Sequence, residues 1–395
     1  KRIDGKSYEK AIEYISSLSQ FVAGTGCERA EKLLERLGNP QDKLKVIHVA
    51  GSNGKGSVCA YLAGILQENG YKTGLFTSPH LIDERERIRI NGMMITKEEF
   101  AEAYARVKAV EDELGKGSLA YFDYFLGIAF IVFLKQNVDI CVIETGLGGR
   151  LDATNAVKNP VLDIIATISL EHTAILGNTI EKIAEEKSGI IKNNVPVVFI
   201  KDKKSVTDII EKNAEENNCE VYGVTQKDFQ IIKNYGYCID FSLNNMYYKN
   251  DCFTITTGAV YQVQNCSLAL TAAEVLKKTG VVKLESNAVH KAVKKVQWHG
   301  RMEQIADNIY VDGAHNPEGI EALICSVSPI TCGRKTILLF SVVNDKDYDR
   351  MIKSICDSNM FDYFVIAGIQ GKRCLDDSCI SDTFKKYTDK PVIDK

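Results

Sequence analysis

An apolar strand that runs into a glycine-rich, lysine-bearing turn is the feature that most constrains this chain. Residues 45–47 read Lys-Val-Ile, and residues 48–57 continue as His-Val-Ala-Gly-Ser-Asn-Gly-Lys-Gly-Ser. Glycines let backbone N–H groups approach a polyphosphate, and a following helix N-terminus adds partial positive charge. The spacing is tighter than that of the standard G-x-x-x-x-G-K-[ST] loop. We therefore expect a variant phosphate loop, whose residues are Gly51, Ser52, Asn53, Gly54, Lys55, Gly56 and Ser57.

Strand-like and helix-like segments alternate after this loop. Residues 138–144 and 161–168 are almost wholly apolar, which is typical of parallel strands covered on both faces. Helical periodicity covers residues 57–69, 97–114 and 123–135, and Asn178 or Thr179 can cap a helix that runs to about Lys187. The fold class that we expect is α/β, with a doubly wound, mostly parallel sheet and a P-loop-like nucleotide site.

The second half of the chain contains two regions whose predicted structure differs from the α/β pattern before them. Residues 219–258 alternate in polarity and predict antiparallel hairpins, and a helix over 263–278 follows. A smaller, Rossmann-like α/β unit then begins, with strands expected over 308–311, 335–342 and 363–368 and helices over 317–327 and 348–356. We expect one domain over residues 1–297, which holds the nucleotide, and a C-terminal domain over residues 298–395.

Composition excludes several classes of protein. The 395 residues carry a net charge of −3, so no basic field predicts binding to nucleic acid. No run of about 18 apolar residues predicts a membrane span. The 12 cysteines lie at irregular spacings without a C-x-x-C pair, which indicates free thiols in a reducing cytosol. We therefore expect a cytoplasmic protein that binds neither nucleic acid nor membranes.

Polar side chains follow several of the expected strands. Ser78, Glu144 and the Glu171-His172 pair each come at the carboxyl end of an apolar strand, where open parallel sheets bind ligands. A carboxylate and an imidazole alone are usually solvated or structural groups. Together with a hydroxyl beside a triphosphate, they predict a magnesium site.

Lys187 lies on the apolar stripe of its expected helix, seven residues after Ile180. A bare ammonium on that stripe is costly unless it is paired or its head reaches water. Two interpretations stay open at this point. The lysine is either a stem packed under a solvated head, or a residue held near the metal site and chemically modified.

Two further segments combine glycines with polar groups. Residues 146–155 form a ten-residue loop with three glycines, which predicts a flexible connection or a mobile loop that closes on an anionic substrate. In the second unit, Asp312 could take a ribose hydroxyl, and His315 could reach a phosphate from across the cleft. Arg301, at the expected boundary, could do the same with full charge.

Together these motifs resemble the folylpolyglutamate synthase family, which includes dihydrofolate synthases, within the Mur ligase superfamily. The matching stretches are residues 37–41, 48–57, 77–81, 86–90, 144–155, 171–177, 186–192, Gln262-x-x-Asn265, 299–303 and 312–317. They extend over essentially the whole chain.

The resemblance implies an ATP-dependent ligase that joins the α-amine of L-glutamate to a pteroate or folyl carboxylate through an acyl phosphate. It implies that Lys55 and the loop amides hold the β- and γ-phosphates, and that Ser78, Glu144 and His172 serve Mg²⁺. Lys187 matches a lysine that is carbamylated in this superfamily, which would make it a metal ligand. The loop over residues 146–155 matches the loop that shapes the folate site. Residues implied to contact the nucleotide from both sides of the cleft are Asn265, Arg301, Asp312 and His315.

The sequence departs from the family pattern in three places. Glu171 stands where aspartate is usual, Asp123 stands where glutamate is common, and a further helix and strand are expected after residues 391–395. Both substitutions keep the charge.

Several alternatives remain open. A bifunctional enzyme would also act on dihydropteroate. A cell-wall Mur ligase would need an additional N-terminal domain, whereas about fifty residues precede the loop here. A nucleotide-binding switch protein would leave the second unit without a role. We expect a monomer.

Overall fold

The computed structural model describes residues 6–19, 24–369, 371 and 373–394. The outermost residues of the two expected domains, 1–5 and 395, therefore lie outside it. An eight-stranded sheet occupies the first part of the chain, in the order β4-β3-β2-β5-β1-β6-β7-β8. Its strands are β1 (Val46–Ala50), β2 (Thr73–Phe76), β3 (Ile88–Ile90), β4 (Met93–Met94), β5 (Ile140–Glu144), β6 (Leu162–Ile165), β7 (Val197–Ile200) and β8 (Val221–Val224).

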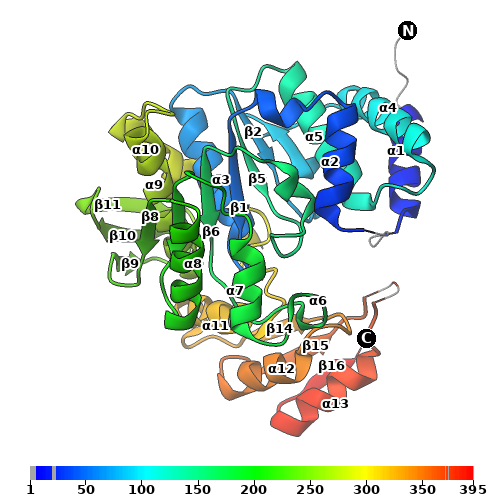
Figure 1. Cartoon of the computed structure of the whole chain (residues 1–395). Coiled ribbons are helices and arrows are strands. Elements are labelled where there is room, and N and C mark those ends of the chain that lie inside the picture. The colour runs from blue at the N-terminus through cyan, green and yellow to red at the C-terminus, as the bar shows by residue number, and fades with distance from the viewer. Residues whose placement is uncertain (1–5, 20–23, 370, 372, 395) are drawn as a thin grey trace.

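The strands from β2 to β8 in this order run parallel, and β3 and β4 add an antiparallel edge. Helices cover both faces of the sheet (Figure 1). One face packs against α3 (Lys55–Glu68), α9 (Tyr261–Lys278) and α10 (Ser286–Lys295). On the other face lie α2 (Gly26–Arg36), α4 (Lys97–Leu114), α5 (Tyr121–Lys135), α7 (Ile180–Ser188) and α8 (Lys204–Glu216), with α1 (Lys6–Ser17) against α4.

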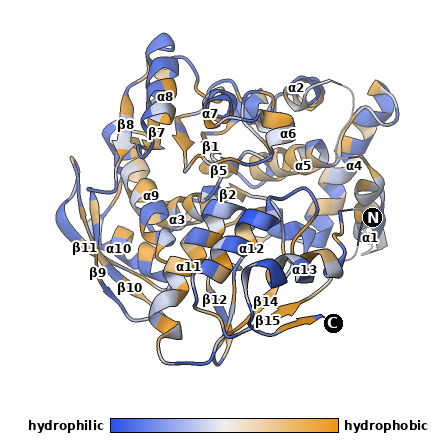
Figure 2. Ribbon diagram, turned by 90° about the horizontal axis from the view of Figure 1, so that it is seen from below, coloured by the Kyte–Doolittle hydropathy of each residue, from blue (hydrophilic) through white to orange (hydrophobic). Residues whose placement is uncertain are grey.

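Burial on both faces explains the apolar runs in the sequence. In β1, Ile47 and Val49 pack into the core beside α3, whereas Val46 and Ala50 pack on the opposite face. The helix α5 is apolar around most of its circumference, and Figure 2 shows the hydrophobic colouring of α5 and the central strands. The expected α/β fold with a doubly wound, mostly parallel sheet is confirmed. No helix in the described residues is both long and apolar enough to cross a membrane.

Residues 219–258 were expected to form antiparallel hairpins, but their first strand, β8, pairs parallel with β7 in the large sheet. The residues that follow do form a separate antiparallel sheet, which packs against α9 and α10. Its strands are β9 (Phe229–Asn234), β10 (Ile239–Asn244) and β11 (Lys249–Ile255).

The last hundred residues lie below the large sheet in Figure 1. A parallel sheet there contains β14 (Ile337–Phe340), β15 (Tyr363–Ile366) and β16 (Val392–Asp394), packed against α11 (Pro317–Thr331), α12 (Tyr348–Asp357) and α13 (Asp377–Tyr387). The strand expected over 308–311 exists as β13 (Ile309–Val311), but it pairs with β12 (Glu303–Ala306) in an antiparallel hairpin. The strand expected there is therefore present, and it lies outside the three-stranded parallel sheet of this part of the chain.

Short helices complete the chain. These are α6 (Thr173–Leu176) and the 3₁₀ helices η1 (Pro40–Lys43), η2 (Glu84–Arg87) and η3 (Ala153–Ala156).

Candidate active site

The phosphate loop connects β1 to α3, as the sequence predicts. Gly54 is the N-cap of α3, with φ at +86°, in the left-handed region that favours glycine. A Cβ at Gly54 would lie 2.2 Å from Asn265 Oδ1, so the absent side chain also makes room for α9 to approach the loop. The first N–H groups of α3, from Lys55 to Ser57, have no acceptor within the helix and are available to an anion.

Two amides of the loop have a different role from the one expected. The N–H groups of Ser52 and Asn53 both donate to the Thr167 carbonyl, at 2.8 and 3.3 Å. They fasten the loop to the segment just after β6, so both amides are already hydrogen-bonded within the protein. The amides of the loop that remain for a phosphate are therefore those from Gly54 onward.

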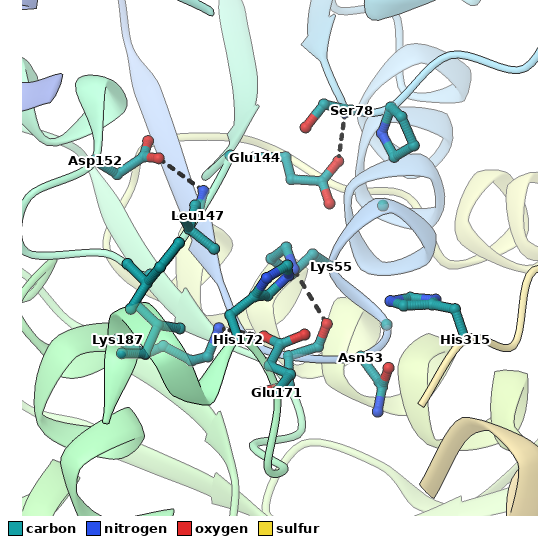
Figure 3. Close-up of a pocket in the computed structure, with 18 of the residues that line it drawn as sticks. Asn53, Lys55, Ser78, Glu144, Leu147, Asp152, Glu171, His172, Lys187 and His315 are labelled. Atoms are coloured by element: carbon teal, nitrogen blue, oxygen red, sulfur yellow. Dashed lines mark hydrogen bonds and ion pairs between the residues drawn. The ribbon is translucent and has the colours of Figure 1, made fainter. Parts of the chain in front are cut away.

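Lys55 is the cation carried by this loop. Its Nζ donates to the carbonyls of Gly51, at 2.9 Å, and Ser52, at 3.1 Å. Figure 3 shows the side chain curled back over its own loop, near Glu171 and His172. Lys55 makes no ion pair within 4 Å among the described residues, although its charge interacts with the carboxylates of Glu144 and Glu171, so the ammonium can still attract a phosphate.

Ser78 and Glu144 face each other across neighbouring strand ends (Figure 3). The Ser78 N–H donates to Glu144 Oε2 at 2.9 Å, and Glu144 is only 3% exposed. Burial raises the pKa of Glu144. Glu144 has no ion-pair partner within 4 Å among the described residues. The more distant Lys55, Arg301 and Arg87 offset the effect of burial on its pKa only in part, so a bound cation would stabilise the carboxylate.

His172 stands at the start of α6 with φ at +46°, which turns its side chain toward the cavity beside Lys55 (Figure 3). Burial lowers the pKa of His172, so the ring is available as a neutral ligand. Within the described residues, no three His, Cys, Asp or Glu side chains gather as a metal cluster. A hydroxyl, one carboxylate and one imidazole still fit Mg²⁺, because this ion keeps waters and phosphate oxygens as its other ligands.

Lys187 is fully buried, at 1% exposure, on the inner side of α7. Its Nζ donates to Glu171 Oε1 at 2.8 Å and to the Gly51 carbonyl at 2.7 Å. Burial lowers the pKa of Lys187 to about 8. Burial alone would raise the pKa of Glu171, but the Lys187 ammonium lowers it to about 2. The interpretation of Lys187 as a stem under a solvated head was wrong, because the head is inside the protein.

The loop over residues 146–155, for which a flexible connection or a mobile loop was expected, contacts α7 through several hydrogen bonds. The Arg150 N–H donates to the Glu186 carbonyl at 2.7 Å, and the Arg150 guanidinium pairs with the Glu186 carboxylate. Asn155 Nδ2 donates to the carbonyls of Arg150 and Gly189. These bonds fix the loop against α7, so that it forms a wall of the cavity.

The residues beyond 298 supply the opposite wall. Asp312 accepts hydrogen bonds from the Tyr261 hydroxyl at 2.5 Å and from the N–H groups of Met302 and Ala314. Oδ2 accepts two of these bonds and joins α9 to the segment that carries Arg301, whereas Oδ1 accepts one and keeps a lone pair for a ligand. His315 Nδ1 lies 2.9 Å from the Gly313 carbonyl, which leaves the other ring nitrogen for a ligand.

A cavity of about 970 Å³ brings these walls together. Every predicted site residue except Gly51 lines it: Ser52, Asn53, Gly54, Lys55, Gly56, Ser57, Ser78, Glu144, His172, Lys187, Asn265, Arg301, Asp312 and His315.

Sequence reasoning missed part of the cavity wall. Arg29 and Asp123 form a buried ion pair at 2.7 Å, and Arg87 lies under Tyr121, 5.4 Å from its ring centre. Lys346 also lines the cavity. Arg87 lies within a stretch already matched to the family, whereas Arg29 and Lys346 carried no recognisable pattern.

Two domains of the Mur ligase family match this chain. The Mur ligase middle domain matches residues 49–273, and the Mur ligase glutamate ligase domain matches residues 300–392.

Relatives with names and solved structures are similar over most of the chain. The dihydrofolate synthase/folylpolyglutamate synthase of Bacillus subtilis is 36% identical over 88% of this chain and 83% of its own length. The crystal structure of a folylpolyglutamate synthase from Thermotoga maritima superposes with a TM-score of 0.85 at 32% identity, covering 99% of this chain and 90% of that one. A complex of a folylpolyglutamate synthase with AMPPCP and folate superposes with a TM-score of 0.86 at 29% identity, covering 98% and 96%.

Proposed function

The chain belongs to the folylpolyglutamate and dihydrofolate synthase branch of the Mur ligases, which are ATP-dependent amide-forming ligases, and we propose that it adds L-glutamate to folates. The proposal rests on the cavity, where a phosphate loop, a buried carboxylate and cations from both parts of the chain line one space. The folyl carboxylate attacks the γ-phosphorus of ATP, and ADP leaves. The α-amine of glutamate then attacks the acyl phosphate, and phosphate leaves as the amide forms.

Phosphate binding belongs to the start of α3. Lys55 would turn from the Gly51 and Ser52 carbonyls toward the β- and γ-phosphates, next to the N–H groups at the helix N-terminus. Such preorganised charge stabilises the negative charge that spreads over the phosphoryl group during transfer.

Ser78, Glu144 and His172 would hold Mg²⁺, which supplies positive charge beside the phosphates. Ser78 and Glu144 are already fixed to each other by a hydrogen bond from the Ser78 N–H. Glu144 therefore presents its second oxygen in a set position before any ligand binds.

Asn265, Arg301, Asp312 and His315 would contact the nucleotide from the far side of the phosphate loop. Asn265 packs directly on Gly54, and Arg301 and His315 bring a guanidinium and an imidazole to the same cavity. We assign Arg301, Asp312 and His315 to a C-terminal domain over residues 298–395, whose closure on residues 1–297, which carry Asn265, would complete the site.

We further propose that Lys187 is carbamylated in the active enzyme. CO₂ adds to the neutral amine with loss of one proton, and a pKa near 8 leaves part of the lysine neutral at physiological pH. Lys187→Ala should be nearly inactive, with partial rescue by a short carboxylate. A ¹³C signal at the lysine amine under bicarbonate tests the adduct, and unchanged activity of Lys187→Ala would refute it.

The assay follows ADP release and product mass with ATP, Mg²⁺, L-glutamate and tetrahydrofolate. We expect turnover only when both glutamate and the folate are present, and none in a folded Lys55→Ala variant. ATP turnover that does not depend on glutamate or on the folate would instead favour a nucleotide-binding switch protein. We do not favour the bifunctional alternative, and dihydropteroate in place of the folate tests it.

The enzyme is expected to work as a monomer in the cytoplasm. All 12 cysteines are free thiols, which suits a reducing compartment. Size-exclusion chromatography with light scattering measures the oligomeric state.

A further inference from the structure

A fully buried histidine stands at the centre of β1, the strand that leads into the phosphate loop. His48 has 0% exposure and does not line the cavity. Its Nε2 lies 2.7 Å from the hydroxyl oxygen of Thr154, which belongs to η3 at the end of the cavity-wall loop. A side chain of the strand that leads into the phosphate loop therefore contacts η3, which ends the cavity-wall loop over residues 146–155.

The hydrogen bonds of Thr154 fix the direction of this contact. Its hydroxyl donates to Asp152 Oδ1 at 2.6 Å, so its single proton is used there. The hydroxyl must accept from His48, whose Nε2 therefore carries the hydrogen. His48 Nδ1 has no partner among the described residues, which agrees with this tautomer. Burial lowers the pKa of His48 to about 3, so the ring stays neutral.

Asp152 connects Thr154 to the cavity wall through hydrogen bonds. Its Oδ1 also accepts from the Thr154 N–H at 3.0 Å, and its Oδ2 accepts from the Leu147 N–H at 2.8 Å (Figure 3). Asp152 thus ties the two ends of the segment 147–152 together. Leu147, Leu151 and Asp152 all line the cavity.

We propose that His48 is a positioning residue that, through Thr154 and Asp152, holds the wall over residues 147–153 in the geometry that binds the folate substrate. This assignment rests on the proposed function, in which that loop shapes the folate site. His48 does not line the cavity in which the substrates would bind. Its loss should therefore weaken folate binding and leave the phosphate loop, which is anchored separately on Thr167, in place.

Matched variants separate the hydrogen bond from the packing. His48→Phe keeps a planar ring without a donor, and His48→Gln places an amide donor near the position of Nε2. We expect His48→Phe to raise the KM for the folate about tenfold, with the KM for ATP changed less than twofold, and His48→Gln to recover most of the loss. Thr154→Val should reproduce His48→Phe, Thr154→Ser should resemble the wild type, and the double variant should lose no more than either single one.

Equal rises in both KM values, or additive losses in the double variant, would overturn the proposal. If His48→Phe does not fold, the comparison of Thr154→Val with Thr154→Ser decides the same question.

Hydrogen exchange gives a readout that does not depend on the substrate. The amide of Leu147 donates to Asp152, so peptides over residues 146–153 should exchange faster in His48→Phe than in His48→Gln, while residues 51–57 stay unchanged. Unaltered exchange over residues 146–153 would contradict the proposal that His48 positions the wall through Thr154 and Asp152. If residues 146–153 exchange as expected in these variants but the wild-type protein ligates no glutamate to a folate, the proposed function is refuted. The positioning role of His48 would still hold.

Discussion

At the scale of single residues, Glu144 combines a folding cost with a binding role. It is buried without an ion pair among the described residues, and burial raises its pKa. Glutamine has the same shape and can still accept the hydrogen bond from the Ser78 N–H. The charge alone distinguishes the two side chains, and the charge is what a divalent cation requires.

We predict that Glu144→Gln lowers Mg²⁺-dependent ligation by at least about 100-fold. The melting temperature should stay equal or rise by a few degrees, because a buried charge is removed. Steady-state ADP release and a thermal melt measure both effects. An active variant, or one that unfolds at a much lower temperature, would show that Glu144 has a structural role.

The sequence predicted which residues gather at this site better than it predicted what each one contacts. Glu144 and His172 could be placed because strand ends converge in a parallel sheet. The ion pair between Lys187 and Glu171 could not, because it joins helix α7 to the loop before α6, and the distance between them depends on how α7 packs. The use of the Ser52 and Asn53 amides by the Thr167 carbonyl depends in the same way on the neighbouring strand.

At the scale of elements, the contact between the cavity wall and α7 depends on one glycine. A Cβ at Gly149 would lie 2.7 and 2.8 Å from the carbonyl oxygens of Glu186 and Lys187. These oxygens belong to helix backbone and cannot move aside easily. The glycine therefore sets how closely the wall approaches the helix turn that carries Lys187.

We predict that Gly149→Ala destabilises the protein by about 1–3 kcal/mol and lowers ligation, because the loop must move away from α7. Gly223→Ala is the control, since its Cβ would meet mainly the flexible Lys201 side chain and should change stability by less than about 1 kcal/mol. Urea unfolding of both variants measures the difference. Equal stabilities would mean that the wall is free to shift.

Helices with a strong hydrophobic periodicity were predictable from the sequence, whereas loops whose conformation depends on contacts with other elements were not. Residues 97–114 match α4 at both ends, since Thr96 caps the helix and Gly115 ends it. The loop over 146–155 looked flexible because it contains three glycines, yet Gly149 lies in close contact with α7 and Gly146 against Phe122. Sequence alone does not distinguish a glycine that loosens a loop from one that permits close packing.

At the scale of the whole molecule, a pair of amides joins the phosphate loop to the part of the chain beyond residue 298. Asn316 Nδ2 donates to Asn53 Oδ1 at 2.9 Å, and Asn53 Nδ2 lies 3.3 Å from Asn316 Oδ1. Asn316 is 3% exposed and also caps α11 by accepting from the Gly319 N–H at 2.7 Å. The same residue thus starts the helix next to His315 and holds it against the loop.

We predict that Asn316→Ser lowers kcat/KM about tenfold while the fold stays intact. Serine remains a good N-cap, so α11 should persist, but its hydroxyl is too short to reach Asn53. Loss of two hydrogen bonds, each with a net contribution of about 0.5–1.5 kcal/mol, should let the cleft open.

Asn316→Asp keeps the cap and one of the two bonds, so its activity should be intermediate. Asp376→Ser exchanges the N-cap of α13 and should leave ligation unchanged. Kinetics and small-angle scattering with nucleotide test the series, and wild-type values for Asn316→Ser in both would mean that the amide pair does not hold the cleft closed.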